Sequence, residues 1–340
     1  MSAVIFDNVS IVFGDYPDQA LPLMDAGQDR AEIQRDTGQV LGVHNCSLTV
    51  EEGEILVLMG LSGSGKSTLL RAVNGLNPVV RGHVEVATDQ GMKDVTNADP
   101  KTLRQIRQHN VAMVFQQFGL LPWRSVRENV GLGLELAGID PKQRNARVEA
   151  QLELVGLADW ADRKVGDLSG GMQQRVGLAR AFATEAPILL MDEPFSALDP
   201  LIRTHLQDEL LDLQSRLKRT IIFVSHDLDE AFKIGNRIAI MEGGRIVQCG
   251  TPQEIFTKPA NDYVSEFVSH MNPLGVLTAA DVMEDVSGET GEAIASTTPI
   301  RVVMKAAKTA ASPLAVTRGD AVVGQITPQI LLTRLLDPRG

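Results

Sequence analysis

The pattern of apolar and polar positions predicts strands that alternate with helices along most of the chain. Residues 46–50 alternate as a half-buried strand does, and the continuous apolar run at 54–59 has the length of a strand buried on both faces. Apolar strands are also expected at 188–192 and 220–226, with a helix at 200–217 between them. Strands alternating with helices predict an α/β fold built on a parallel sheet.

The flanking segments follow other patterns. Residues 3–13 mix apolar and polar positions as an edge strand would, and residues 17–40 are polar and irregular, with a short helix expected near Asp29–Arg35. Helical patterns at 100–108 and 125–160 are broken by glycine and proline, and we expect a helical subdomain at about 100–180.

The end of the chain predicts a second, smaller unit. Residues 238–250 are expected to form a hairpin with Gly243–Gly244 as its turn. The composition then shifts, and residues 313–336 predict strand, turn, strand and helix. We therefore expect domains at 1–272 and 276–340, with residues 17–40 as an insertion in the first.

Charge excludes one class of function. The chain has 32 Lys and Arg against 43 Asp and Glu, a net charge of −11. A chain this acidic is a poor general binder of nucleic acid, because that affinity depends on cations that neutralise phosphates. The chain shows no apolar stretch of about 18 residues and no basic, apolar start of a secretory signal, so we expect a soluble cytoplasmic protein.

The two cysteines carry little chemistry. Cys46 and Cys249 lie far apart in the sequence. Two cysteines cannot supply a four-cysteine zinc site or a dense disulfide framework. Each is expected to be a small buried apolar residue.

The clearest motif is GLSGSGKS at residues 60–67, which fits G-x-x-x-x-G-K-[ST] between an expected strand and an expected helix. Glycines let backbone N–H groups surround phosphate oxygens, and the following helix N-terminus adds positive potential. A lysine here reaches the β- and γ-phosphates, and the hydroxyl of the next residue can ligate Mg²⁺. The expected nucleotide-binding residues of this loop are Gly60, Leu61, Ser62, Gly63, Ser64, Gly65, Lys66, Ser67 and Thr68.

A pair of acids supports this interpretation. Asp192 and Glu193 lie at the end of the buried strand expected at 188–192, where carboxylates are costly unless they have a role. Asp192 can hold Mg²⁺ directly or through water, and Glu193 can polarise an attacking water. Without Lys66 the pair would be interpreted as an exposed strand end. With Lys66 it favours hydrolysis or controlled use of a nucleoside triphosphate.

A third motif, LSGGMQQ at 168–174, precedes a helix that Ser169 could simply cap. In this order, after the phosphate loop and before the acidic pair, it resembles the signature of ATP-binding cassette (ABC) proteins. The resemblance extends to Gln116 in MVFQQF, to SALD at 196–199 and to His226 in FVSHD. It also places Phe13 where an aromatic ring stacks on adenine, although Phe13 could equally be packing.

The resemblance implies a P-loop ATPase fold with an antiparallel β edge and a helical subdomain, and a mechanism that needs two cassettes. Two copies pair head to tail, and each ATP with its Mg²⁺ lies between the two copies. The catalytic residues would be Lys66, Glu193 as base and His226; the Mg²⁺ ligands would be Ser67, Gln116 and Asp192. Residues completing the site from the partner copy would be Ser169, Gly170, Gly171, Gln173 and Asp199.

Several details favour a transport ATPase over other branches of that family. The segment between Lys66 and Ser169 is too short and broken for the coiled coil of DNA-repair members, and one cassette argues against translation-associated members. The stretches at 60–76, 112–130, 195–214 and 219–256 resemble importers of quaternary amines such as choline and glycine betaine. Importers of proline betaine or histidine-like cations, and a non-transport ABC ATPase, stay open as alternatives.

That resemblance implies partners and a location. The chain would lie on the cytoplasmic face of the membrane, bound to two permease subunits and, through them, to an extracellular or periplasmic substrate-binding protein. Residues Phe118–Asn129 are the expected groove for a permease helix, with helical-subdomain core as the alternative. Residues 276–340 resemble one shortened copy of a cystathionine-synthase-type (CBS) regulatory unit, for which we expect a dimerisation or vestigial role.

Overall fold

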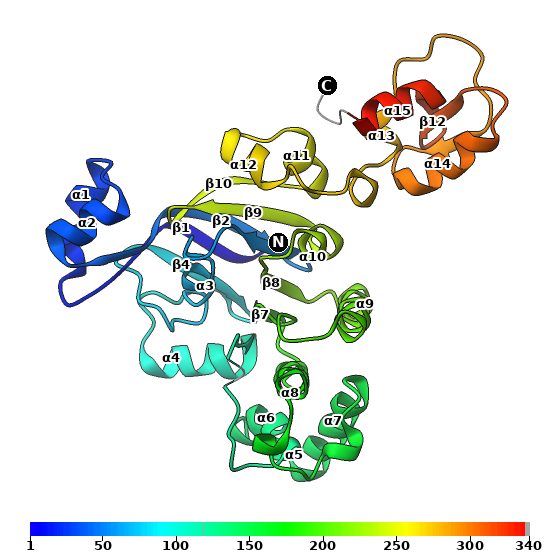
Figure 1. Cartoon of the computed structure of the whole chain (residues 1–340). Coiled ribbons are helices and arrows are strands. Elements are labelled where there is room, and N and C mark those ends of the chain that lie inside the picture. Colours follow the sequence, from blue (N-terminus) through cyan, green and yellow to red (C-terminus); the bar gives the residue numbers. More distant parts are fainter. Residues whose placement is uncertain (118, 337–340) are drawn as a thin grey trace. The chain divides into compact units, whose positions relative to one another are not determined.

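A computed structural model describes residues 1–117 and 119–336 of the chain (Figure 1). They form two compact units. The first comprises Met1–His226 with Ala239–Ile246, and the second comprises Asp227–Ile238 with the chain from Val247 onward. The two units are described in turn.

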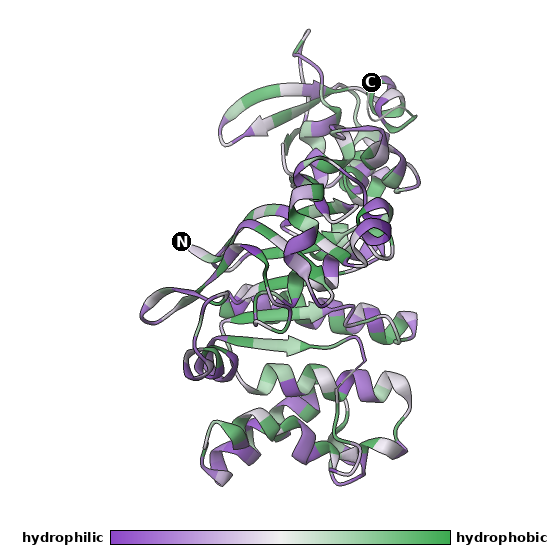
Figure 2. Ribbon diagram, turned by 90° about the vertical axis from the view of Figure 1, so that its left-hand side faces the viewer, coloured by the Kyte–Doolittle hydropathy of each residue, from purple (hydrophilic) through white to green (hydrophobic). Residues whose placement is uncertain are grey.

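The central element of the first unit is a six-stranded sheet, with strand order β10-β9-β3-β8-β7-β6. The neighbours among β3, β8, β7 and β6 run parallel. Every residue of β3, β7 and β8 is buried, and Figure 2 shows these strands in hydrophobic colours, which explains why they appear in the sequence as continuous apolar runs. The six strands are β3 (Ile55–Met59), β6 (Val111–Val114), β7 (Ile188–Asp192), β8 (Thr220–Val224), β9 (Arg237–Glu242) and β10 (Arg245–Gly250). The parallel α/β prediction is confirmed.

A four-stranded antiparallel sheet forms the β edge, in the order β2-β1-β4-β5. Its strands are β1 (Ser2–Phe13), β2 (Val40–Glu51), β4 (Arg81–Thr88) and β5 (Gly91–Asp94). The prediction that residues 3–13 form an edge strand is wrong, because β1 pairs with both β2 and β4. The interior position explains why most of β1 is buried. The strands β4 and β5 were not expected from the sequence.

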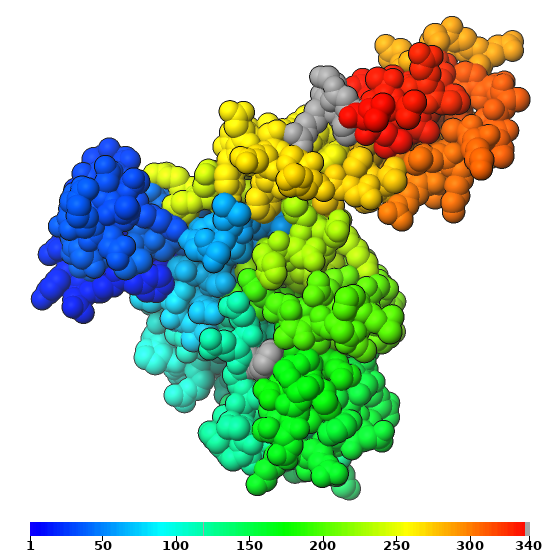
Figure 3. Space-filling view, in the orientation of Figure 1, coloured from blue at the N-terminus to red at the C-terminus, as the bar shows by residue number. Residues whose placement is uncertain are grey.

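The insertion between β1 and β2 is folded. It contains the short helices η1 (Pro17–Ala20) and α1 (Leu21–Asp25), followed by α2 (Arg30–Thr37). A capping box of Asp29 and Glu32 begins α2, which lies where a short helix was expected near Asp29–Arg35. Its buried residues pack on β1 and β2 in one cluster, and the insertion projects at one end of the first unit in Figure 3. The cluster contains Val12, Ala20, Met24, Ile33 and Leu41.

The remaining helices of the first unit fall in two groups. One accompanies the sheets: α3 (Lys66–Leu70), α4 (Pro100–Gln105), η2 (Ile106–Asn110) and α9 (Pro200–Leu217). The other is a helical subdomain in which α5, α6 and α7 pack on α8 (Figure 1): α5 (Val126–Val130), α6 (Leu132–Leu136), α7 (Pro141–Leu154), η3 (Ala158–Trp160), η4 (Val165–Asp167) and α8 (Gly170–Ala183). The expected start at residue 100 is wrong, since Val111–Val114 form a strand of the parallel sheet.

The second unit begins with helices and ends with helices around a small sheet. The elements of this unit are α10 (Leu228–Ile234), α11 (Pro252–Thr257), α12 (Asp262–Phe267), η5 (Pro273–Gly275), α13 (Ala279–Val282), β11 (Ala293–Ala295), α14 (Ile300–Thr309), β12 (Leu314–Arg318), β13 (Ala321–Ile326) and α15 (Pro328–Leu336). The strands form one sheet, β11-β12-β13. The boundary differs from the expected 272–276, because α10, α11 and α12 group with the C-terminal elements; Gln253 Nε2, for example, donates a 3.3 Å hydrogen bond to the Val276 carbonyl.

Candidate functional site: a nucleotide cavity at the phosphate loop

The loop between β3 and α3 has the backbone that its glycines permit. Gly60 has φ +139°, and a Cβ there would lie 2.1 Å from the carbonyl oxygen of Met241, so only glycine fits. Lys66 is buried, and its Nζ donates to the carbonyls of Gly60 (2.8 Å) and Leu61 (3.0 Å). Burial lowers the pKa of Lys66, although the nearby carboxylates of Glu193 and Asp192 oppose the shift. The ammonium group of Lys66 is thus held by two carbonyls of its own loop.

A cavity of about 630 Å³ opens beside this loop. Ten of the predicted site residues line it: Phe13, Ser62, Gly63, Gly65, Lys66, Ser67, Thr68, Gln116, Glu193 and His226. Of the other predicted loop residues, Leu61 is exposed and Ser64 is buried with an Oγ that has no partner in the described chain. The sequence did not predict that Arg30, Gln34, Val40, Leu41 and Gly42 also line the cavity.

Asp192 lies fully buried beneath the loop. The Ser67 hydroxyl donates a 2.6 Å hydrogen bond to its Oδ1, and the Arg71 guanidinium makes a 2.9 Å ion pair with its Oδ2. Carboxylate and hydroxyl oxygens are the ligands that Mg²⁺ prefers, so these residues fit that ion. Arg71 was missed, although it lies four residues after Ser67 on one face of the same helical turn, a spacing that could have revealed it.

The carboxylate of Glu193 contacts two polar side chains from distant parts of the chain. Gln116 Nε2 donates to its Oε2 at 3.1 Å, and His226 Nδ1 lies 3.4 Å from the same oxygen. Glu193 has φ +49°, a left-handed conformation that costs free energy in a non-glycine residue, and its N–H donates to the Val224 carbonyl. The structure therefore brings the three predicted residues together at the cavity.

The predicted signature residues lie elsewhere on the same chain. Ser169 Oγ accepts from the Met172 N–H at the start of α8, Gln173 donates to the Leu168 carbonyl, and Asp199 caps α9. Ser169, Gly170, Gly171, Gln173 and Asp199 are exposed or half-buried, and none of them lines the cavity. In a single chain, these five residues lie outside the nucleotide cavity, where a second protein surface could contact them.

A buried glutamine in the signature helix was also missed by the sequence interpretation. Gln174 is 1% exposed and contacts the loop after β7, where its amide bonds to the main chain of Glu193 and Ala197. The motif LSGGMQQ contains both glutamines, and only Gln173 was predicted as a site residue. The helical spacing, which turns position 174 inward, was the signal that could have identified it.

A phosphate loop, a buried aspartate below it and a glutamate held by a glutamine and a histidine define an ATP-binding cassette, a class of P-loop ATPase. A family model described as ABC transporter matches residues 43–196. The chain belongs to the ABC transporter family as an ATP-binding subunit, and it hydrolyses ATP with Mg²⁺ as cofactor.

The similar proteins are transport ATP-binding proteins. The chain is 47% identical to the glycine betaine/carnitine transport ATP-binding protein GbuA of Listeria monocytogenes, over 83% of this chain and 70% of that protein. It is 49% identical to the glycine betaine/proline betaine protein ProV of Escherichia coli, over 81% and 68%. The dimeric structure of a bacterial ABC transporter cassette matches with a TM-score of 0.63 at 29% identity, over 73% of this chain and 98% of that one.

Among the described residues, no helix combines the length and the apolar character needed to cross a bilayer.

Proposed function

We propose that this chain energises an importer of quaternary amines, with choline and glycine betaine as the foremost substrates. The support is its identity of 47–49% to betaine transport cassettes over most of its length. A trimethylamine N-oxide transport protein of Ruegeria pomeroyi, 46% identical over 80% of this chain and 78% of that protein, extends the same chemistry of a methylated nitrogen centre.

The observation that carries the mechanism is the pair of contacts from Gln116 and His226 to one oxygen of Glu193. Two groups on one oxygen fix the carboxylate at the cavity, where it would accept the proton of the attacking water. His226 would position this base and the γ-phosphate. Lys66 would bind the β- and γ-phosphates in place of its own loop carbonyls.

Ser67, Asp192 and Gln116 would hold Mg²⁺. The Gln116 Nε2 is directed at Glu193, which leaves its carbonyl oxygen for the ion. Mg²⁺, when bound, neutralises charge on the phosphate oxygens. The Asp192 carboxylate already has two partners below the loop, Ser67 and Arg71, so its orientation is fixed before nucleotide binds.

Phe13, with Val40 and Leu41, would form the apolar wall for adenine. The Phe13 ring is 38% exposed and lines the cavity. It lies close to the backbone of β2, because a Cβ on Gly42 would be 2.9 Å from the ring and 3.0 Å from Thr68 Cγ2. A partly exposed aromatic ring that lines the cavity suits stacking on a base.

Two copies would pair head to tail, so that Ser169 and Gly171 of one face the phosphate loop of the other. The dimer would sit on the cytoplasmic face of the membrane against two permease subunits, with a substrate-binding protein acting through them. In support, the signature residues lie outside the chain's own cavity. Residues 276–340 would have a dimerisation or vestigial role.

The docking groove for a permease helix would lie between the parallel sheet and the helical subdomain. A cavity of about 300 Å³ there has Phe115, Leu76 and Leu136 in its lining, and the two leucines are 46% and 65% exposed. Of the described residues in the expected segment Phe118–Asn129, only Gly119 lines this cavity. Phe118 lies outside the described residues, and Trp123 is 69% exposed.

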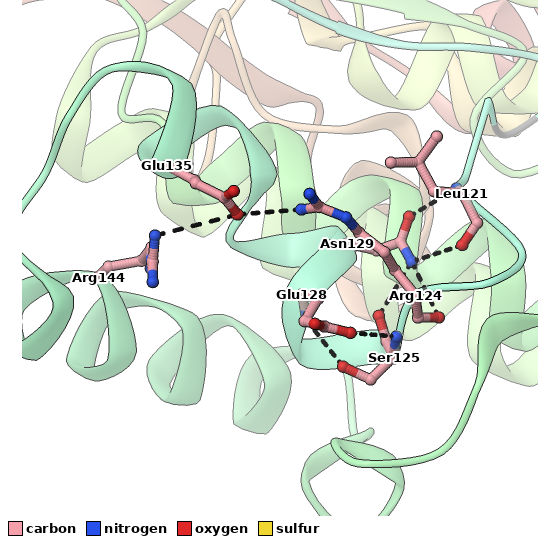
Figure 4. Close-up of polar contacts among 7 residues, drawn as sticks. All are labelled: Leu121, Arg124, Ser125, Glu128, Asn129, Glu135 and Arg144. Carbon is pink, nitrogen blue, oxygen red and sulfur yellow. Dashed lines mark hydrogen bonds and ion pairs between the residues drawn. The ribbon is translucent and has the colours of Figure 1, made fainter.

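The polar residues of that segment serve the helical subdomain. Asn129 is fully buried and donates to the Leu121 and Ser125 carbonyls, while Arg124 pairs with Glu135 at 3.0 Å (Figure 4). Arg124 therefore stabilises the helical subdomain, and the exposed Trp123 is left for docking.

Uptake of labelled choline, glycine betaine and histidine in a strain lacking this chain tests the function. We expect loss of uptake of at least one quaternary amine, its return with the wild-type gene and no return with Glu193→Gln. Unchanged uptake of all three would contradict the proposal.

A further inference from the structure

The insertion contributes to the nucleotide cavity, which the sequence did not predict. Helix α2 places Arg30 and Gln34 in the cavity lining. Ile33 of the same helix is fully buried in the cluster that contains Val12 and Leu41, so this core anchors the helix. Ile33 lies three residues after Arg30, on the adjoining face of the helix, so its burial also fixes the position of Arg30. The insertion is therefore an ordered wall of the site.

Arg30 contacts the phosphate loop directly. Its Nη1 donates to the carbonyl of Gly63, and its Nη2 donates to the carbonyl of Gly42 in β2. The turn between β9 and β10 also meets the guanidinium, since a Cβ on Gly244 would lie 2.8 Å from Arg30 Nη2. The Gly244 N–H donates to the Ser64 carbonyl at 3.1 Å. The guanidinium thus lies where the loop, β2 and the hairpin turn converge.

The bond to Gly63 acts on a glycine of the phosphate loop that has open space beside it. Gly63 has φ +78°, and a glycine-rich loop has many conformations to lose on binding phosphate. Fixing the Gly63 carbonyl fixes the plane of its peptide with Ser64. Charged donors make stronger hydrogen bonds than neutral ones. Because the guanidinium is planar and rigid, two hydrogen bonds from it also fix its orientation relative to the two carbonyls.

We propose that Arg30 is a positioning residue of the nucleotide site: it preorganises the phosphate loop through Gly63 and Gly42 and adds a second cationic group beside Lys66. The ligand class is the nucleotide phosphate chain already assigned to the cavity, so this proposal rests on the nucleotide site proposed above. The insertion of residues 17–40 then has a role in nucleotide affinity.

Three variants of the full chain test this role: Arg30→Ala, Arg30→Lys and the control Arg35→Ala. Arg35 lies in the same helix, pairs with Asp36 and has a side chain that is 70% exposed. The first measurement is the Kd of a fluorescent Mg-ADP analogue, which the protein does not turn over. The second is amide hydrogen exchange of residues 61–65 without nucleotide.

We expect Arg30→Ala to raise the Kd about tenfold and to speed loop exchange about fivefold. Arg30→Lys keeps the charge but not the fork, so it should raise the Kd by about threefold. Arg35→Ala should change neither readout. A thermal melt of each variant identifies a merely structural effect.

A Kd for Arg30→Ala within twofold of wild type, or a lower melting temperature with unchanged Kd and loop exchange, would overturn the proposal. If the wild-type protein itself failed to bind Mg-ADP, the assignment of the site would be wrong, and the role of Arg30 with it. Equal losses in Arg30→Ala and Arg35→Ala would also overturn it, since the effect would then come from the helix as a whole.

Discussion

Gln174 and Glu193 are joined by a hydrogen bond that links the signature helix to the catalytic loop. The Gln174 Nε2 donates to the main-chain carbonyl of Glu193 at 3.2 Å, and its Oε1 accepts from the Ala197 N–H at 3.1 Å. One buried amide thus spans the loop that follows β7. If α8 moves, either these two hydrogen bonds break or the loop that contains Glu193 moves with the helix.

We expect Gln174→Ala to lower kcat about tenfold while the Kd for nucleotide stays within about twofold, because the variant frees the backbone of Glu193 and leaves the phosphate loop intact. Two lost buried hydrogen bonds should also lower the free energy of unfolding by about 1–3 kcal/mol. Steady-state ATPase assays and urea unfolding measure the two effects. The control Gln143→Ala, at an exposed position of α7, should change neither; a wild-type kcat in Gln174→Ala would refute the link.

A buried histidine makes the stability of the cassette depend on pH. His44 is 3% exposed, and its Nε2 lies 3.2 Å from the Arg245 guanidinium. Burial lowers the pKa of His44 below its usual 6.5, with Arg245 and Arg81 adding to the shift and Asp25 opposing it. The folded state therefore binds this proton less readily than the unfolded chain does.

Because the unfolded chain gains the proton first, the free energy of unfolding should fall as pH drops below about 6.5, by at most about 1.4 kcal/mol per pH unit for this group. Urea unfolding of wild type and His44→Asn between pH 7 and pH 5 tests this. As pH falls, the free energy of unfolding of the wild type should decrease more than that of His44→Asn. His270→Asn, at an exposed position, serves as control. Parallel pH curves for wild type and His44→Asn would rule the effect out.

The two thiols should differ in reactivity. Burial raises the pKa of Cys46 to about 11, and its Sγ lies 3.3 Å from the Gly244 carbonyl. Cys249 is only half-buried. Since the thiolate is the reactive form, we expect Cys249→Ala to show no rapid labelling by a disulfide reagent at pH 8 until the protein is unfolded. Rapid labelling of native Cys249→Ala would show that Cys46 is accessible.

Local sequence patterns predicted those elements whose own residues form a recognisable pattern. The buried strands β3, β7 and β8 appeared as apolar runs. The phosphate loop follows β3 directly, and the acidic pair lies at the end of β7. Sequence interpretation failed where pairing is long-range. The partner of β1 on its second side, β4, lies beyond the phosphate-loop helix, so no local pattern marks β1 as an interior strand.

The same reason explains which site residues escaped prediction. Arg30 reaches the loop only because Ile33, three residues on, is buried against β1 and β2, and that register is a tertiary property. Gln116, Glu193 and His226 were predicted from family motifs, but their meeting at one oxygen could be seen only in the folded chain. The motifs therefore identified which side chains belong to the site, and the tertiary packing determines the distances between them.

The most direct test is the turnover and association state of Glu193→Gln with Mg-ATP, measured by ATPase assay and sedimentation velocity. Removing the base while keeping the shape should lower kcat by about a hundredfold or more, and the variant should retain ATP and sediment as a dimer, since hydrolysis no longer releases the partner. Wild-type turnover in this variant, or a protein that stays monomeric with saturating nucleotide, would contradict the assignment of Glu193 and the closed two-subunit site.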